Sequence, residues 1–564
     1  MNHYKNALRV IIISMIISVS CKSSSNRDRS KIISNPEKID QQTGNNIKET
    51  LEYALQNKSK IDDSITLQLA SIVNSFYISN DFSNVWSRKE KWQPLADSIF
   101  NFIQTASLSG LFPNDYHFQD LKSLKIILDN DSLKRMDANL WTKADLMLTD
   151  GFIHFAKDLK DGRLGADSVT HKNPTPDTFF VAALNSLLSS KQLTPLLIQI
   201  EPKNKGYISL KSCLPQFIDS MDSKIYTYVK YPFKKNDLKD SLCFIKNIQK
   251  RLFESKAINF INKLPDSLEL NIAVKSFQKQ RKIKQDGNVS TSLIKTMNLN
   301  DAERFKRIAI TLDRYKQLPD SMPEKFIWVN LPSFYLQVWD KDTLVLDSKI
   351  ICGKPTTRTP LLTSFITDMV TYPTWTVPNS IITKQYLPKL KNNPNYLSAI
   401  GLKLVDNKGE PVNPNDVNWN KYQKGIPYKV VQNSGDDNAL GVLKFNFSNP
   451  FAVYLHDTNQ RYLFKNTGRA LSHGCVRVQE WDKLAYYIAK NDSLNLKVGD
   501  SLRYTTDSIK TWLANKEHKK ISVKNKVSLF ILYFSCVAKN GNIKFYDDIY
   551  GDDMIMREKY FAGK

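Results

Sequence analysis

The sequence predicts a multidomain α+β protein, with a helical N-terminal scaffold, a small three-helix module and a mostly-β C-terminal domain that carries an inserted cap. Three observations predict this class. The chain has 564 residues, whereas a single hydrophobic core rarely grows beyond about 250–300 residues. Apolar residues recur at helical spacing in the N-terminal half, and short runs with strand-like alternation, separated by Pro and Gly, occupy the C-terminal half.

The first residues predict a secretory signal peptide over 1–20. Lys5 and Arg9 precede the apolar run VIIISMIISV, which is shorter than the ~20 residues that span a bilayer. A charged start followed by a short apolar run is typical of a signal peptide. We therefore expect the chain in the periplasm or elsewhere in the cell envelope.

Cys21 directly follows the predicted signal peptide. The small residues before it resemble a bacterial lipoprotein cleavage site, which implies lipidation of Cys21 and anchoring to a membrane. Ser18 stands where Leu is usual in that motif, so the alternative is cleavage by an ordinary signal peptidase and a soluble periplasmic protein. Residues 21–48 are rich in Ser, Asn and Gln and predict a flexible tether.

Helical segments are expected between the tether and the β domain. Residues 49–235 predict a helical scaffold domain, because apolar residues such as Ile72 and Phe76 follow helical spacing. Residues 236–300 predict the small module of three helices. Residues 301–322 predict a connecting helix.

Residues 323–505 predict the mostly-β domain, because short strands between Pro and Gly breaks are typical of a sandwich or a partial barrel. Residues 376–432 form a long excursion inside it, and such insertions are often lids. Residues 506–564 are expected as a C-terminal extension. Four aspartates in the extension are interpreted as a solvated acidic turn rather than a calcium site, namely Asp547, Asp548, Asp552 and Asp553.

The clearest chemistry lies in one cysteine and two histidines. Cys475 follows His473 by two residues and His456 by nineteen. A thiol becomes a strong nucleophile when a nearby imidazole takes its proton. The alternation before His456 predicts a strand that ends there, and Gly474 lets the backbone approach a substrate so that N–H groups face an oxyanion. The cluster indicates covalent acyl transfer.

Two alternatives stay open from these residues alone. A lone cysteine is often a small buried hydrophobe, and a lone histidine is often structural. The other alternative is a zinc site built from His456, Asp457, His473 and Cys475, although the chain lacks the close cysteine pairs that structural zinc sites favour.

A histidine, fifteen residues and then Ser-His-Gly-Cys resembles the signature of L,D-transpeptidases, the cysteine enzymes that cross-link bacterial peptidoglycan. The segments FIWVNLPSFYLQVW, GKPTTRTP and YPTWTVPNSI are similar to the large, multidomain branch of that family, and Arg477 follows the cysteine as in that branch. The segments ASLSGLFPNDYHF at 106–118 and LTDGFIHFAKDLKDGRL at 148–164 resemble its scaffold region. Residues 236–300 resemble the common peptidoglycan-binding fold. The β domain is then expected to be the L,D-transpeptidase catalytic domain, with residues 376–432 as its cap.

The resemblance implies a role for several residues. Cys475 is the nucleophile and His456 the general base, and Asp457 is a candidate third partner through its carboxylate or its main chain. The residues expected to form the oxyanion pocket and its surroundings are Ser472, His473, Gly474 and Arg477. The residues expected to bind substrate are Tyr372, Trp375, Asn438 and Asp457.

The implied function is the formation of 3→3 peptidoglycan cross-links through a cysteine thioester, with release of terminal D-Ala. Tetrapeptide stems are the expected donor and acceptor, and no cofactor and no metal are expected. The alternatives are an L,D-carboxypeptidase, an enzyme that tethers proteins to peptidoglycan, and a non-catalytic wall-binding lipoprotein. The net charge of +24 suits an anionic polymer, and because the lysines are spread without a nucleic-acid motif, no nucleic-acid partner is expected.

Overall fold

The computed structural model describes residues 33, 35–165, 169, 173–222, 224–231, 236–281, 283, 285–494 and 504–563. The chain divides into two compact units, one of residues up to 101 with 116–152 and one of residues 102–115 with the remainder from 153. The expected signal peptide and Cys21 lie outside the described residues. Among the helices that are described, none has the length and apolar character needed to cross a membrane.

The first unit is helical, with one short hairpin. Its α1 (Ile39–Gln56) buries Ile39, Ile47 and Leu51 along one face. The flexible tether expected over residues 21–48 is therefore wrong for residues 39–48, which belong to this helix. Burial of such a face at helical spacing is what stabilises a helix in a folded domain. The other elements are α2 (Ala70–Ile78), α4 (Phe118–Asn130), α5 (Ser132–Arg135) and the hairpin β1 (Ser87–Arg88) and β2 (Lys91–Trp92), while α3 (Pro94–Gln104) and α6 (Ala138–Asp161) each extend across the division between the units.

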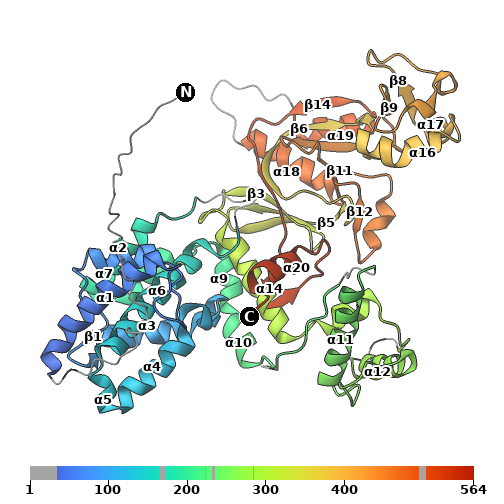
Figure 1. Ribbon diagram of the computed structural model, residues 1–564. Helices are drawn as coiled ribbons and strands as arrows, with labels where there is room; N and C mark the ends of the chain where they lie inside the picture. The colour runs from blue at the N-terminus through green and yellow to red at the C-terminus, as the bar shows by residue number, and fades with distance from the viewer. Residues whose placement is uncertain are drawn as a thin grey trace, which may run out of the picture. The chain divides into compact units, whose positions relative to one another are not determined.

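The second unit opens with helices and then the three-helix module. The module comprises α11 (Leu238–Glu254), α12 (Ser267–Gln280) and α13 (Thr291–Met297), as expected. Asp266 forms a capping box with Glu269 at the start of α12, which satisfies backbone N–H groups that the helix leaves unpaired. The module has its own core around Phe244, Val274 and Leu293, and α11 and α12 lie close together in Figure 1. The preceding helices are α7 (Asp177–Ser190), α8 (Leu193–Ile200), α9 (Lys205–Ser212) and α10 (Leu214–Asp219).

The connecting helix α14 (Asp301–Lys316) leads into the β-rich domain and is capped by Asn300, whose side chain accepts from the Glu303 N–H. The strands are hydrogen-bonded in the order β10-β11-β13-β5-β4-β3-β15-β6, and β6 also pairs with β10, so the path closes on itself. A closed path of this kind is a barrel. The strands of the path are β3 (Lys325–Asn330), β4 (Tyr335–Asp340), β5 (Thr343–Gly353), β6 (Leu362–Thr371), β10 (Leu443–Phe447), β11 (Leu455–His456), β13 (Val476–Val478) and β15 (Ser528–Leu532).

The barrel core contains alternate strand residues, among them Val329, Leu336 and Phe445, together with Leu484 and Ile488 of α18 (Trp481–Leu494). Each such fully buried side chain contributes on the order of 1.5–3 kcal/mol. Three further elements complete this part of the chain: β12 (Ala470–Ser472), which pairs with β5, β14 (Lys519–Ser522), which pairs with β6, and α19 (Thr506–Ala514).

The catalytic domain is expected to end at residue 505, but β14 and β15, which follow that residue, belong to the same sheet. β15 pairs with β3 in parallel and with β6 in antiparallel orientation, and four of its five residues are buried. Its apolar sequence therefore completes the barrel instead of forming a separate extension. The chain then continues from β15 into the hairpin of β16 (Cys536–Lys539) and β17 (Asn542–Phe545), and into α20 (Asp552–Met556).

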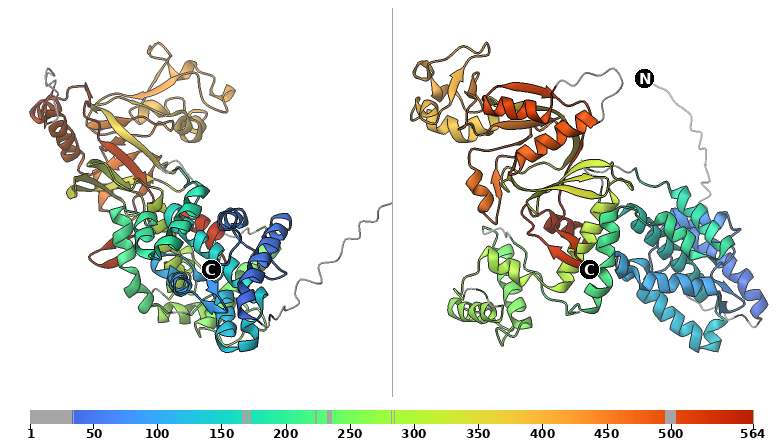
Figure 2. Two further views of the ribbon diagram at one scale, coloured as in Figure 1. Left: turned by 90° about the vertical axis from the view of Figure 1, so that its left-hand side faces the viewer. Right: turned by 180° about the vertical axis from the view of Figure 1, so that it is seen from behind.

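The insertion over 376–432 folds around a small core of its own. Its three-stranded sheet has the order β7-β9-β8, and Figures 1 and 2 show its strands and short helices as one separate group. The core residues include Leu387, Leu390 and Val430. The elements are β7 (Trp375–Thr376), α15 (Asn379–Ile381), α16 (Leu387–Leu390), α17 (Tyr396–Ala399), β8 (Lys403–Val405) and β9 (Lys429–Gln432).

We predict that the barrel folds without this insertion. Thr376 and Val431 are direct partners across β7 and β9, so an Asn-Gly turn joining them in place of 377–430 closes a hairpin with little strain. Because the removed core is separate, the melting temperature of the barrel should change by no more than about 5 °C, measured by circular dichroism. Loss of cooperative unfolding in the shortened protein would show that the two cores are one.

Candidate active site

The register of three neighbouring strands gathers five polar side chains on one face of the barrel. Lys444 of β10 lies opposite His456 of β11, which in turn lies opposite Arg477 of β13. Continuing that parallel register by one step places Tyr454 opposite Cys475, two residues before His456 and Arg477. Directly paired residues, and residues two apart, share one face of a sheet. The intervening residues, which include Leu443, Leu455 and Val476, are buried in the core on the other face.

Cys475 lies at the centre of this polar face. The Tyr454 hydroxyl and the Tyr454 N–H are both hydrogen-bonded to its sulfur. Burial raises the pKa of the thiol above its ordinary value, and the two hydrogen bonds and the positive charges of Lys444 and Arg477 act in the opposite direction. The thiol is thus protonated at rest, and the groups around it stabilise the thiolate once the proton leaves.

His456 has the properties of a neutral proton acceptor. It is only 4% exposed, and burial together with the charge of Arg477 lowers its pKa to about 3. Backbone groups of Asp457 and Leu440 hydrogen-bond to the ring, whereas Nδ1 is buried with no hydrogen-bond partner in the described part of the chain. His456 is therefore a neutral imidazole on the same barrel face as the Cys475 thiol, and its Nδ1, unpartnered among the described residues, is available to accept a proton.

The turn before Cys475 is shaped by Ser472 and Gly474. The Gly474 N–H donates to Ser472 Oγ (3.1 Å), and Ser472 Oγ donates to the Cys475 carbonyl. Gly474 has φ of 124°, a conformation that side chains disfavour. Because the Gly474 N–H is already used, the Cys475 N–H is the donor beside the sulfur that remains without a partner among the described residues. It is the group positioned to stabilise an oxyanion.

Three other residues expected at the site are His473, Trp375 and Tyr372. His473 is exposed and contacts Gln385 of the inserted cap, and the Trp375 side chain is hydrogen-bonded to the Tyr454 hydroxyl, which connects β7 to the thiol. Tyr372 is buried and its hydroxyl donates to Asp436 Oδ1 (2.9 Å).

Asn438 and Asp457 are corrected as substrate-binding side chains. Asn438 is 1% exposed, and its amide donates to the Asn433 carbonyl and accepts from the Leu440 N–H. The Asp457 carboxylate is fully buried and accepts from Arg461 and from the Val442 N–H. Both side chains hold loops in place because all their polar atoms are used there. Asp457 serves His456 through its main chain, not through its carboxylate.

Two residues were not identified from the sequence, Tyr454 and Lys444. Tyr454 is hydrogen-bonded to Cys475 and lies under the Lys444 ammonium, which is 4.0 Å from the ring centroid. Polar and apolar residues alternate in β10 and before β11, and Lys444 and Tyr454 each occupy an outward position between buried neighbours. This alternation indicates that the two residues belong to the site only once the pairing of β10 with β11 is known.

No group of three or more His, Cys, Asp or Glu side chains among the described residues is placed to hold a metal ion. The four residues of the zinc alternative therefore do not converge: His456 and Cys475 lie on the barrel face, the Asp457 carboxylate is bound to Arg461, and His473 is exposed beside the cap.

Comparisons with known proteins match two parts of the chain. Residues 324–498 match the family described as the L,D-transpeptidase catalytic domain, and residues 71–214 match a scaffold domain. A protein of Haemophilus influenzae named "Putative L,D-transpeptidase" is 36% identical over 248 residues, which are 44% of this chain and 48% of that protein. The chain thus spans about half the length of this relative.

Among solved structures, the catalytic domain from an E. faecium L,D-transpeptidase acylated by ertapenem is 12% identical and aligns with 38% of this chain and 99% of that chain, with a TM-score of 0.17. An L,D-transpeptidase from Stackebrandtia nassauensis is 12% identical and aligns with 55% of this chain and 97% of that chain, with a TM-score of 0.15.

The environments of Cys475 and His456 predict a specific pH profile. With the pKa of His456 near 3 and that of Cys475 raised, the thiolate is not formed by an ion pair at neutral pH. The rate constant for alkylation of Cys475 by iodoacetamide should rise about tenfold per unit between about pH 6 and about pH 8. A rate that is constant over this range would instead indicate a resident thiolate–imidazolium pair.

Proposed function

We propose that this chain, which carries an L,D-transpeptidase catalytic domain over residues 324–498 and a scaffold domain over residues 71–214, is a cysteine acyltransferase that forms 3→3 cross-links in peptidoglycan. The observation that carries the proposal is that these groups share one polar face of the barrel. On this face Cys475 is hydrogen-bonded to Tyr454 and lies next to the His456–Arg477 pair. This face supplies a nucleophile, a base and a backbone donor in one place.

The proposed reaction begins with a tetrapeptide stem as acyl donor. His456 takes the proton of Cys475, and the sulfur attacks the carbonyl carbon of the third stem residue. The Cys475 N–H stabilises the oxyanion, a contribution of about 3 kcal/mol for one donor. The bond to the terminal D-Ala then breaks, D-Ala leaves with the proton from His456, and a thioester remains on Cys475.

The second half of the reaction releases the enzyme. The side-chain amine of the third residue in a neighbouring stem attacks the thioester carbonyl and gives its proton to His456. The carbon–sulfur bond breaks, an amide forms between the two stems, and the thiol is regenerated with that proton. The positive charges of Lys444 and Arg477 favour both halves of the reaction, because each half forms an anionic sulfur or oxygen close to these charges.

The acceptor distinguishes two related functions. Water in place of the amine gives an L,D-carboxypeptidase, and an amine of a protein gives an enzyme that tethers envelope proteins to peptidoglycan. A non-catalytic wall-binding lipoprotein is the remaining alternative, and it has no use for a buried neutral His456 or for a hydrogen-bonded Cys475.

We further propose that the enzyme acts in the periplasm, attached to a membrane through a lipid on Cys21, with peptidoglycan stems as its partners. The apolar run before Cys21 and the small residues next to it support this location.

Formation of the cross-link should require both Cys475 and His456. With purified disaccharide-tetrapeptide, the wild-type protein should give a cross-linked dimer that has lost one D-Ala, and Cys475→Ala should give none. His456→Ala should be slower by about 10²–10⁴-fold, since it lacks its general base. Cys243→Ala, which removes an exposed free thiol, is the matched control and should retain full activity. Normal dimer formation by Cys475→Ala, measured by chromatography of the products, would contradict the proposal.

The second prediction concerns Lys444. Lys444→Met removes the charge but keeps most of the side-chain length, so the pKa of Cys475 should rise by about one unit. The pH dependence of iodoacetamide alkylation measures this shift. Lys403→Met, at an exposed position on β8, should leave the profile unchanged. An identical profile for wild type and Lys444→Met would remove Lys444 from the site.

A further inference from the structure

The segment 353–359 lies directly behind the Ser-His-Gly-Cys turn. The Lys354 N–H and the Thr357 hydroxyl both donate to the Ser472 carbonyl (3.0 Å each), and the Thr359 hydroxyl donates to the Gly474 carbonyl (2.8 Å). A Cβ atom on Gly474 would lie 3.6 Å from the backbone of this segment. The turn that carries the nucleophile therefore rests on a segment more than a hundred residues earlier in the chain.

The bond from Thr359 to the Gly474 carbonyl has a consequence for the chemistry. The Gly474 carbonyl and the Cys475 N–H belong to one planar peptide group and point in opposite directions. Holding the carbonyl therefore fixes the direction of the N–H. That N–H is the donor proposed for the oxyanion, so its aim depends on Thr359.

Tyr550, from the C-terminal extension, holds the segment in turn. Its side chain is 5% exposed. Its hydroxyl donates to the Gly353 carbonyl (2.8 Å) and accepts from the Thr359 N–H (3.2 Å). Arg358 donates to the Tyr550 carbonyl and to Asp552 Oδ1 (2.8 Å). The Tyr550 hydroxyl thus lies between the two ends of the segment and fixes both.

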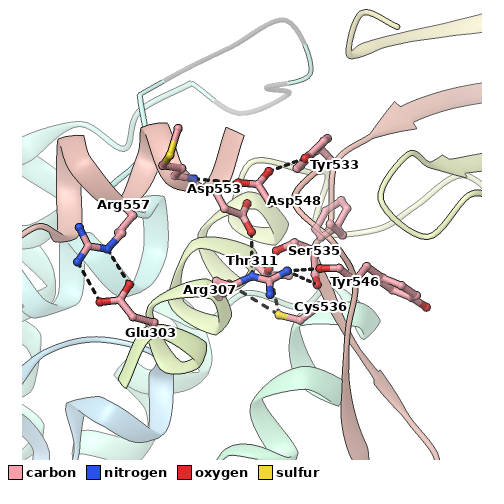
Figure 3. Close-up of polar contacts among 12 residues, drawn as sticks. Glu303, Arg307, Thr311, Tyr533, Ser535, Cys536, Tyr546, Asp548, Asp553 and Arg557 are labelled. Carbon is pink, nitrogen blue, oxygen red and sulfur yellow. Dashed lines mark hydrogen bonds and ion pairs between the residues drawn. The ribbon is translucent and has the colours of Figure 1, made fainter. Parts of the chain in front are cut away.

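Tyr550 is itself fixed through Tyr533. The Tyr533 hydroxyl accepts from the Tyr550 N–H (2.9 Å) and donates to Asp548. Figure 3 shows the bond from Tyr533 to Asp548. The interpretation of the four aspartates as a solvated turn is therefore wrong for Asp548, Asp552 and Asp553, because each one has a hydrogen-bonded partner.

The extension is anchored on the connecting helix α14 by partly buried ion pairs. Asp553 pairs with Arg307 and, at 2.6 Å, with Arg314, and Arg557 makes two hydrogen bonds to Glu303. Figure 3 shows Asp553 turned toward Arg307 and Arg557 turned toward Glu303. Asp553 and Glu303 are buried, and removal of either arginine partner is costly because it leaves an uncompensated buried charge.

We propose that Tyr550 is a positioning residue for acyl transfer: through Thr359 its hydroxyl aims the Cys475 N–H at the oxyanion, and the C-terminal extension thereby controls the catalytic power of the site. The inference rests on the proposed function for the role of Cys475. A segment outside the barrel then has a catalytic consequence.

The test compares two reactions of the same thiol in the full chain. In the first, 4-nitrophenyl acetate acetylates Cys475: the sulfur–carbon bond forms, the ester carbon–oxygen bond breaks, 4-nitrophenolate leaves, and the thiol proton passes to His456. This reaction develops an oxyanion. In the second, iodoacetamide alkylates the sulfur without one. Cys475→Ala supplies the blank for both reactions.

Tyr550→Phe and Thr359→Val should each slow acetylation roughly tenfold to a hundredfold, while alkylation stays within about threefold of wild type. Thr359→Ser keeps the hydroxyl and should acetylate at nearly the wild-type rate. Tyr560→Phe is the matched control, because its hydroxyl accepts from the Gly165 N–H (3.1 Å), away from the segment, and it should behave as wild type.

Acetylation at the wild-type rate in Tyr550→Phe would overturn the proposal, and so would an equal loss of acetylation and alkylation, which indicates general damage. A wild-type thiol that is alkylated but never acetylated would also overturn it. Wild-type protein that reacts with 4-nitrophenyl acetate but not with disaccharide-tetrapeptide would refute the proposed function, and the acetylation rates of the variants would still decide the role of Tyr550.

Discussion

The pairing register of β10, β11 and β13 is the constraint on which the site depends. Lys444, His456 and Arg477 are neighbours only because their strands pair with those residues opposite one another. A shift of one residue in any of the three strands would turn its polar residues into the core and its apolar ones outward. The buried residues Leu443, Leu455 and Val476 oppose such a shift, so the packing of the core maintains the geometry of the chemistry.

The same division between core and site explains what the sequence allowed to be predicted. His456 and Cys475 could be identified because they lie in one short, distinctive stretch, and the helical and β-rich parts follow from periodicity. Closure of the barrel could not be predicted, because β15 pairs with β3 across about two hundred residues of chain. Tyr454 and Lys444 were missed for the same reason: their role comes from which strand lies opposite, and local alternation does not specify it.

Local composition also misled at three places. Residues 39–48 resemble a polar linker, yet their few apolar side chains all fall on one buried helical face. Asn438 and Asp457 resemble substrate ligands, but the barrel uses them to hold loops. The partners of Asn438 and Asp457 lie within fifteen residues of them in the chain. The C-terminal aspartates are the third place, and there the partners are distant in the chain, since Asp553 pairs with Arg307 and Arg314 of α14.

The most direct test of the central claim is peptide mapping by tandem mass spectrometry after brief incubation of the protein with disaccharide-tetrapeptide and acid quenching. We expect one modified peptide, with the donor stem minus D-Ala attached to Cys475 as a thioester that hydroxylamine removes. An adduct on any other residue, or an unmodified Cys475 in folded, reduced protein that nevertheless forms product, would contradict the assignment of Cys475 as the nucleophile.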